Sequence, residues 1–327
     1  MRAGVASSPT GSSTGQALVA DIGGSNSRFA LVDAEGWPER IAVMENATAA
    51  DLESAVARYL EETGVRPRTA TFAVAGPIQG EQIALTNSPW RFRRSEFAKR
   101  FGFAQFQVVN DFEAIAWALP RLNARHIRPL GPASLQREGV KLVLGPGTGL
   151  GVAALLPFAV RSHAVASEGG HVLFGAQAQD EEAVFVRLRE ESRVVSAESV
   201  LSGPGLLRLA QALHPGSRYR DSEAIMAAAH SGEAQAQAAT RLFVRLLGRF
   251  AGDMALAFKA LGGVYIAGGV AHGLGALLDA AEFRGAFELH PPHAALLQAV
   301  PTFLITSDQP GLIGCAALAR MNAAARE

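Results

Sequence analysis

Cysteine is almost absent from this chain of 327 residues, which contains only Cys315. A single thiol excludes an intrachain disulfide and any zinc site built on several thiolates, and it fits a reducing compartment. We therefore expect a cytoplasmic protein. Because Cys315 lies in an apolar helical pattern, we expect its side chain to pack in the core.

Long apolar runs and an excess of charge of one sign are also missing. No run approaches the roughly 20 residues that span a bilayer. Residues 1–16 are rich in Ser, Gly, Thr and Ala, lack the apolar stretch of a signal peptide, and are predicted to form a disordered tail. With 30 basic against 30 acidic residues, the chain has no electrostatic bias toward nucleic acid or anionic lipid. We expect neither as a partner.

What the chain does contain is a repeated α/β pattern. A glycine-rich loop at 22–27 joins predicted strands at 17–21 and 28–33, and a second at 145–151 joins strands at 141–144 and 152–156. Each hairpin is followed by helical patterns and a further apolar strand. These lie at 51–62, 69–75, 180–191, 204–214, 222–261 and 264–267, before a strand at 303–306 and a helix opened by Pro310. A single core stops growing at roughly 250 to 300 residues, so two lobes are expected.

The two glycine loops indicate phosphate binding. A glycine turn exposes consecutive backbone N–H groups, which form an anion site. One such loop alone is more often a plain hairpin turn, but here each carries a hydroxyl, Ser25 or Thr148, and Asp21 precedes the first. Neither loop fits the Walker or dinucleotide pattern. Asp21 could hold Mg²⁺ through water, since this ion keeps most of its hydration shell.

An Asn-Asp pair, Asn110-Asp111, stands where an apolar run ends and a helical pattern begins. The carboxyl ends of strands in an open α/β sheet face the ligand crevice, so Asp111 is a candidate general base. The alternative is that Asp111 only caps the following helix.

A second polar group comprises Glu168, His171 and Glu198. Such groups suit adjacent sugar hydroxyls, which both donate and accept hydrogen bonds. Zinc is an alternative for Glu168 and His171, but it requires a third ligand that the sequence does not place. Glu198 could also be a first-turn helix acid behind the cap Ser196.

Eight segments, in this order and spacing, resemble the bacterial glucokinase family. They are 21–28, 85–90, 109–112, 145–151, 168–171, 196–198, 201–205 and 266–269. That family belongs to the hexokinase and actin-like ATPase superfamily. The resemblance implies a two-lobed α/β actin-like ATPase (ribonuclease H-like) fold with an interdomain cleft. The small domain would comprise 17–121 plus 307–327, and the large domain 122–306.

The same resemblance implies phosphorylation of the glucose 6-hydroxyl, the first step of glycolysis, with ATP and Mg²⁺, by a homodimer. Asp111 would be the base, and the sugar-binding residues would be Asn87, Asn110, Asp111, Glu168, His171 and Glu198. The nucleotide-binding residues would be Ala20, Asp21, Ile22, Gly23, Gly24, Ser25, Gly147, Thr148, Gly149, Gly268 and Gly269.

The first loop departs from the family pattern. The family usually has Gly-Gly-Thr-Asn-Ala-Arg where this chain has Gly-Gly-Ser-Asn-Ser-Arg, ending at Arg28. Ser25 keeps the hydroxyl but loses a methyl group and some stiffness, so we expect modest weakening at most. The single cysteine cannot supply the zinc motif common in related repressor-type sugar kinases. A kinase for another hexose, such as mannose or fructose, and a sugar-sensing regulator remain as alternatives.

Overall fold

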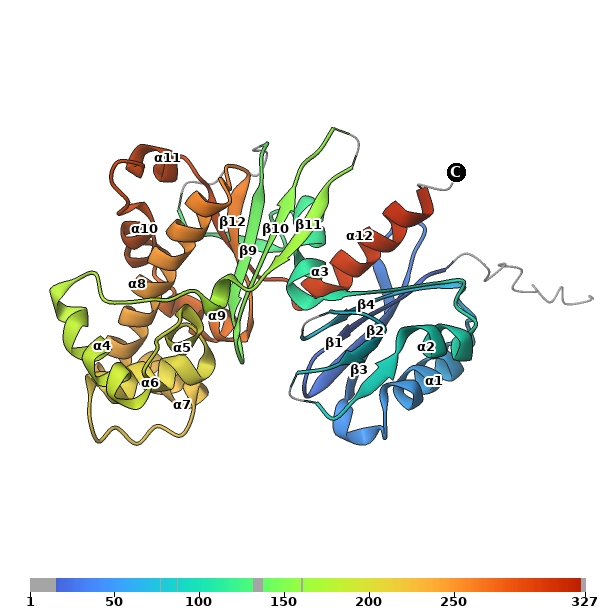
Figure 1. Cartoon of the computed structure of the whole chain (residues 1–327), viewed down its shortest axis with the longest axis horizontal. Helices are drawn as coiled ribbons and strands as arrows, with labels where there is room; N and C mark the ends of the chain where they lie inside the picture. The colour runs from blue at the N-terminus through green and yellow to red at the C-terminus, as the bar shows by residue number, and fades with distance from the viewer. Residues whose placement is uncertain (1–15, 77, 87, 132–137, 160, 325–327) are drawn as a thin grey trace, which may run out of the picture. The chain divides into compact units, whose positions relative to one another are not determined.

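The computed structural model describes residues 16–76, 78–86, 88–131, 138–159 and 161–324 (Figure 1). The predicted tail lies outside the described residues except for Gln16, and so does Asn87. As far as it is described, the chain forms two compact units, Met1–Ala114 with Gly311–Glu327, and Ile115–Pro310. The division inferred from the sequence, at 121/122 and 306/307, stays a prediction.

The first unit is built on a five-stranded sheet in the order β3-β2-β1-β4-β7. Its strands are β1 (Leu18–Ile22), β2 (Asn26–Val32), β3 (Pro38–Glu45), β4 (Thr69–Val74) and β7 (Gln105–Asn110). β1, β2 and β3 form an antiparallel meander, whereas β1, β4 and β7 run parallel. In the parallel part, Val74 pairs with both Ile22 and Asn110. The carboxyl ends of three strands therefore meet at one edge.

Helices cover both faces of this sheet. Figure 1 shows α1 (Leu52–Thr63) and α2 (Arg94–Phe101) on one face and α12 (Pro310–Ala324) on the other. α1 begins where Asp51 accepts a hydrogen bond from the Ser54 N–H and ends at Gly64, whose φ of 70° few other residues adopt. The small hairpin of β5 (Gln82–Ala84) and β6 (Arg91–Arg93) completes the main elements, together with the start of α3 (Asp111–Ala118), which belongs to this unit as far as Ala114.

The second unit repeats the strand order of the first. Its sheet runs β11-β10-β9-β12-β13-β8. The strands are β8 (Ile127–Pro129), β9 (Lys141–Pro146), β10 (Leu150–Leu156), β11 (His163–Ser167), β12 (Gly263–Ile266) and β13 (Thr302–Ile305). Here too an antiparallel meander is joined to parallel strands, through β9, β12 and β13. The repeated hairpin-and-strand pattern predicted from the sequence is confirmed.

The second unit has eight helices in its described part, of which α6, α7, α10 and α11 pack against the long helix α8. They are α4 (Gln179–Glu191), α5 (Ala197–Val200), α6 (Gly203–Leu213), α7 (Ser222–His230), α8 (Ala234–Ala257), α9 (Gly269–Leu274), α10 (Ala280–Glu288) and α11 (Ala294–Gln298). The predicted helical region 222–261 is two helices, because the chain turns at Gly232 with a φ of 92°. The sequence pattern does not predict α9, α10 and α11. These helices are short, glycines lie within α9 and α10, and Pro291 and Pro292 precede α11.

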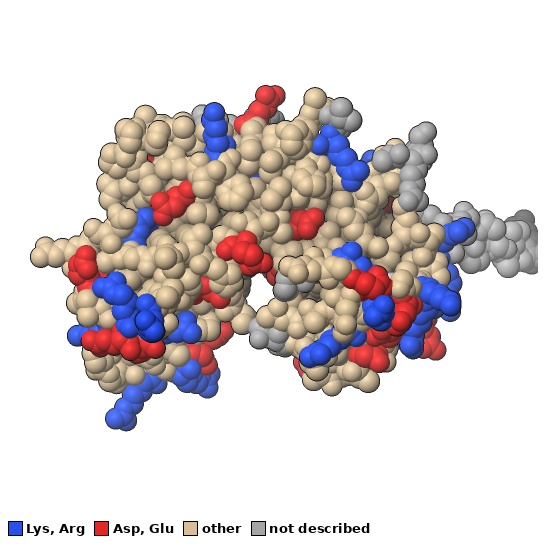
Figure 2. Space-filling model, viewed as in Figure 1, with Lys and Arg blue, Asp and Glu red and all other residues tan. Residues whose placement is uncertain are grey.

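Cys315 is fully buried in α12, so its predicted core position is confirmed. No helix in the described part of the chain is long and apolar enough to cross a membrane. On the face drawn in Figure 2, acidic and basic side chains are interspersed over each unit.

Candidate active site

Two acidic residues of the first unit, Asp21 and Asp111, lie at the carboxyl-end edge of its sheet. Asp21 is the fourth residue of β1, and Asp111 directly follows β7. The negative charge of Asp21 acts on the Asp111 carboxyl group, although 90 residues of sequence separate the two. The strand register therefore brings together the two carboxylates that the sequence singled out.

Asn110, and not Asp111, caps helix α3. The Asn110 Oδ1 accepts hydrogen bonds from the N–H groups of Phe112 (2.9 Å) and Glu113 (3.2 Å), and its Nδ2 donates to the Gly76 carbonyl (3.2 Å). The Asp111 carboxylate accepts a bond from the adjacent Phe112 N–H at 3.0 Å. Because the neighbouring amide serves as the cap, the capping alternative for Asp111 is not needed.

Burial raises the pKa of Asp111 to about 6, and the charge of Asp21 adds to this effect. Burial also raises the pKa of Asp21, against the opposing charge of Arg28. Asp111 would thus be mostly ionised at neutral pH and yet bind a proton more strongly than an ordinary aspartate. This is the property that a general base needs.

The first glycine loop is a closed turn between β1 and β2. The Gly23 N–H donates to the Asn26 carbonyl at 3.0 Å. Ala20 and Ile22 are fully buried residues of β1. A cavity of about 540 Å³ lies beside the loop and is lined in part by Gly24, Ser25, Asn46, Ser88, Pro89 and Trp90.

The second glycine loop is joined directly to the predicted sugar-binding residues. The Gly203 N–H donates to the Gly147 carbonyl at 2.8 Å. Glu198 Oε2 accepts a hydrogen bond from the Leu150 N–H at 2.9 Å. A Cβ at Gly149 would lie 2.4 Å from the same oxygen. Glycine is therefore required at 149 so that the carboxylate can approach the loop.

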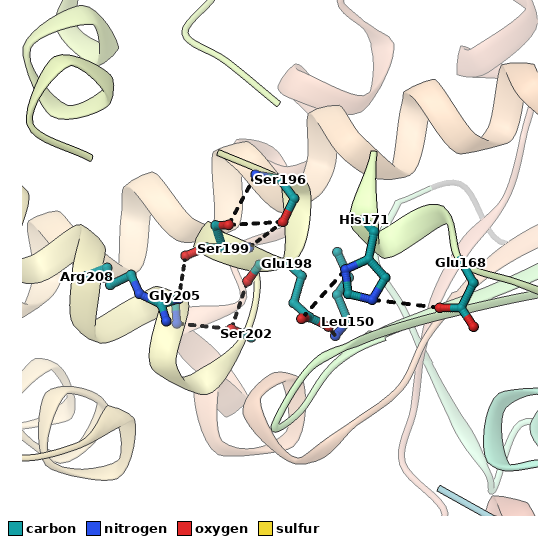
Figure 3. A network of polar contacts seen from close by, with 9 residues as sticks. All are labelled: Leu150, Glu168, His171, Ser196, Glu198, Ser199, Ser202, Gly205 and Arg208. Atoms are coloured by element: carbon teal, nitrogen blue, oxygen red, sulfur yellow. Dashed lines mark hydrogen bonds and ion pairs between the residues drawn. The ribbon is translucent and has the colours of Figure 1, made fainter. Parts of the chain in front are cut away.

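Glu168, His171 and Glu198 lie together, as Figure 3 shows. His171 Nε2 is 3.7 Å from Glu168 Oε2, and its Nδ1 is 3.9 Å from Glu198 Oε1. The Glu168 side chain is 81% exposed and that of Glu198 is 33% exposed, so solvent and small solutes reach these groups. No set of three or more His, Cys, Asp or Glu side chains that could hold a metal occurs among the described residues.

The position of Glu198 behind a helix cap is confirmed, but the capping geometry does not account for its carboxylate. Ser196 is the N-cap of α5 and accepts a bond from the Ser199 N–H. The Glu198 carboxylate instead bonds to Leu150, which belongs to the β9–β10 hairpin. Glu198 therefore ties the group that includes His171 to the glycine loop.

Gly268 lies against the end of β9. Its φ is 93°, and a Cβ there would lie 2.4 Å from the Pro146 carbonyl oxygen. Gly269 begins α9, and a Cβ on it would meet no atom within 4 Å. The structure thus places Gly268 and the Gly147–Gly149 loop side by side in the second unit.

Two residues that contact the first glycine loop or Asp21 were missed by the sequence analysis. Asn46 bonds to the glycine loop, and a Cβ at Gly311 would lie 2.8 Å from Asp21 Oδ2. Neither belongs to a local motif, and both reach the site only through tertiary contact.

The contact at Gly149 generates a testable expectation. Replacing Gly149 with alanine should displace the Glu198 carboxylate and break its bond to Leu150. We expect the KM for the sugar to rise about tenfold or more, because small misplacements of substrate-holding groups are costly. Gly285→Ala is the matched control, since a Cβ there meets no atom within 4 Å. Steady-state kinetics that show the two variants to be alike would contradict the assignment.

Comparison with known proteins identifies the family. A family model described as glucokinase matches residues 18–322. A curated glucokinase from Rhizobium meliloti is 38% identical over 310 residues, which are 93% of this chain and 91% of that protein. A relative from Burkholderia lata, a "Bifunctional protein glk", is 39% identical over 310 residues that are 93% of this chain. This chain spans about half of that relative, 48% of its length.

Solved structures show the same likeness. The crystal structure of a glucokinase from an Antarctic psychrotroph has a TM-score of 0.86 at 36% identity, covering 94% of this chain and 99% of that one. The structure of Balamuthia mandrillaris glucokinase in complex with glucose has a TM-score of 0.78 at 25% identity, covering 94% of each chain. The predicted fold class, α/β with the sugar-kinase form of the actin-like ATPase topology, is confirmed. The chain belongs to the glucokinase family.

Proposed function

We propose that this chain is a glucokinase, which transfers the γ-phosphoryl group of ATP to the 6-hydroxyl of D-glucose. The observation that carries the proposal is Asp111, a carboxylate with a pKa of about 6 at the same sheet edge as the first glycine loop. Membership of the family supports it, as does the glucose bound in the related Balamuthia enzyme.

Asp111 would orient the 6-hydroxyl and accept its proton late in the reaction. In phosphoryl transfer, most of the barrier reduction comes from alignment and charge stabilisation. Glu168, His171 and Glu198 would hold the other hydroxyls, since their carboxylates accept and the imidazole can donate. Asn110 would contribute through the second N–H of its amide, because its oxygen accepts the helix-cap bonds and its nitrogen already donates once to Gly76. Asn87 stays a proposed contact.

The glycine loops would bind the phosphates through backbone N–H groups, with Gly268 and Gly269 toward the adenosine. Mg²⁺ fits the first unit because Asp21 and Asp111 repel one another and a cation relieves that repulsion. Asp21 would hold the ion through water, and the ion would neutralise phosphate charge. We also propose a cytoplasmic homodimer acting in the first step of glycolysis.

Two alternatives are weaker. A kinase for mannose or fructose would share both glycine loops, since these do not set the hydroxyl pattern. A sugar-sensing regulator is disfavoured, because this chain keeps Asp111 and both loops.

A coupled assay with glucose, mannose, fructose and glucosamine tests the substrate, and ATP, ADP and polyphosphate test the donor. We expect the highest kcat/KM for glucose with ATP. A higher kcat/KM for another hexose would identify that hexose as the substrate in place of glucose. Turnover of none of the four sugars would overturn the proposal.

Asp111→Asn should lower kcat by roughly 10²- to 10⁴-fold, the usual contribution of general-base assistance. Glucose affinity, measured by isothermal titration calorimetry, should stay within about tenfold, because the amide keeps the shape of the side chain. Asp51→Asn is the matched control, since Asn caps helices as well as Asp does. Full activity of Asp111→Asn would remove the base assignment.

The raised pKa of Asp111 predicts an acid limb in the pH profile of kcat/KM for MgATP, which reports the enzyme before the cation binds. Only the ionised base is active, so activity should be present above a midpoint near about 6 and be lost as the pH falls through it. Asp21→Asn removes the neighbouring negative charge, which lowers the pKa of Asp111, and should shift the midpoint to lower pH. A midpoint near 4, the ordinary range of aspartate, or one that Asp21→Asn leaves in place, would contradict this reading.

A further inference from the structure

Asn46, in the short 3-10 helix η1 (Asn46–Thr48) after β3, holds the first glycine loop from one side. Its Nδ2 donates to the carbonyls of Gly23 (2.8 Å) and Gly24 (3.0 Å), and its backbone N–H donates to the Ser25 carbonyl (2.8 Å). Asn46 itself is 7% exposed. A single buried residue thus gathers three successive carbonyl groups.

The position of those carbonyls determines where the loop N–H groups point. In a trans peptide the C=O and the next N–H point in opposite directions. Because the Gly23 and Gly24 carbonyls converge on the Asn46 amide, the N–H groups of Gly24 and Ser25 leave the loop on the side away from Asn46. Consecutive N–H groups on one side form the concave anion site that phosphate requires.

Ser27 fixes the orientation of the Asn46 amide. The Ser27 Oγ, which is fully buried, donates to Asn46 Oδ1 at 2.6 Å. With the oxygen facing this hydroxyl, the amide nitrogen must face the glycine carbonyls, since the reverse would set oxygen against two oxygens. This chain has Ser27 where the family usually has alanine. The Ser27 hydroxyl therefore has a specific partner in η1, outside its own strand.

We propose that Asn46 is a positioning residue for the phosphates of the nucleotide, set by Ser27 and acting through the Gly23–Ser25 loop. The inference rests on the proposed kinase function and adds a residue to it. Asn46 touches no reacting atom in this role, so its loss should weaken nucleotide binding more than sugar binding.

Asn46→Asp gives the sharpest test because it keeps the acceptor for Ser27 and replaces the donor with an oxygen that repels both glycine carbonyls. We expect the KM for ATP and the dissociation constant for ADP to rise about tenfold or more. The KM for glucose should stay within about twofold. Ser27→Ala, which leaves both amide bonds to the loop, should raise the KM for ATP by less than about threefold.

Asn123→Asp is the matched control. Asn123 lies in an exposed turn of the second unit, and its Oδ1, which aspartate retains, accepts from the Arg125 N–H. If Asn46→Asp does not fold, Asn46→Ala is tested by the same comparison of nucleotide and glucose binding. We then expect a smaller rise in the KM for ATP, because water can solvate the freed carbonyls. Thermal melting of each variant separates a loss of folded protein from a loss of affinity.

Unchanged ADP affinity in Asn46→Asp, measured by calorimetry, would overturn the inference. An equal rise in the KM for ATP and for glucose would also overturn it, because that is the result of a purely structural role. ADP binding is independent of turnover. If the unaltered protein binds ADP but phosphorylates no hexose, the proposed function fails while the Asn46 comparison still decides the inference. If it binds no ADP, both fail.

Discussion

The parallel register of β1, β4 and β7 is the constraint on which the candidate site of the first unit depends. Val74 pairs with Ile22 on one side and with Asn110 on the other. Each strand therefore ends at the same edge, and the loops that follow start from neighbouring positions. The consequence is electrostatic as well as geometric, because the charge of Asp21 contributes to the raised pKa of Asp111. A slip of one residue would turn each of these side chains to the opposite face.

Asn110 and Asp111 are adjacent at the end of β7, and their side chains make different contacts. Asn110 satisfies two N–H groups of α3 and donates to the Gly76 carbonyl beyond β4. The Asp111 carboxylate is therefore not needed as the helix cap, and it stands on a helix whose start is fixed. The proposed role of Asp111 as a base requires a rigid support of this kind, since proton transfer allows only a small positional tolerance.

The two units share a sheet order but use glycine for different reasons. At Gly23 and Gly24 the loop carbonyls are gathered by Asn46, which leaves N–H groups on the other side. In the second unit, Gly149 admits the Glu198 carboxylate and Gly268 admits the Pro146 carbonyl. There the missing Cβ permits close packing between segments far apart in sequence. Glycine-rich motifs of similar appearance can thus be required by a ligand, by packing, or by both.

The sequence by itself determined the repeated hairpin-and-strand pattern, the candidate residues and the family, because periodicity and motif spacing are local properties that survive without coordinates. Strands at 69–75 and 264–267 and helices at 51–62 and 180–191 agree with the structure to within a residue or two. Only the tertiary structure decided that Asn110 caps α3, that Glu198 bonds to Leu150, and that Ser27 faces Asn46. These contacts join residues on different elements or depend on the direction of a side chain. The order of residues along the chain does not specify strand register or side-chain direction, since both follow from how the sheet packs.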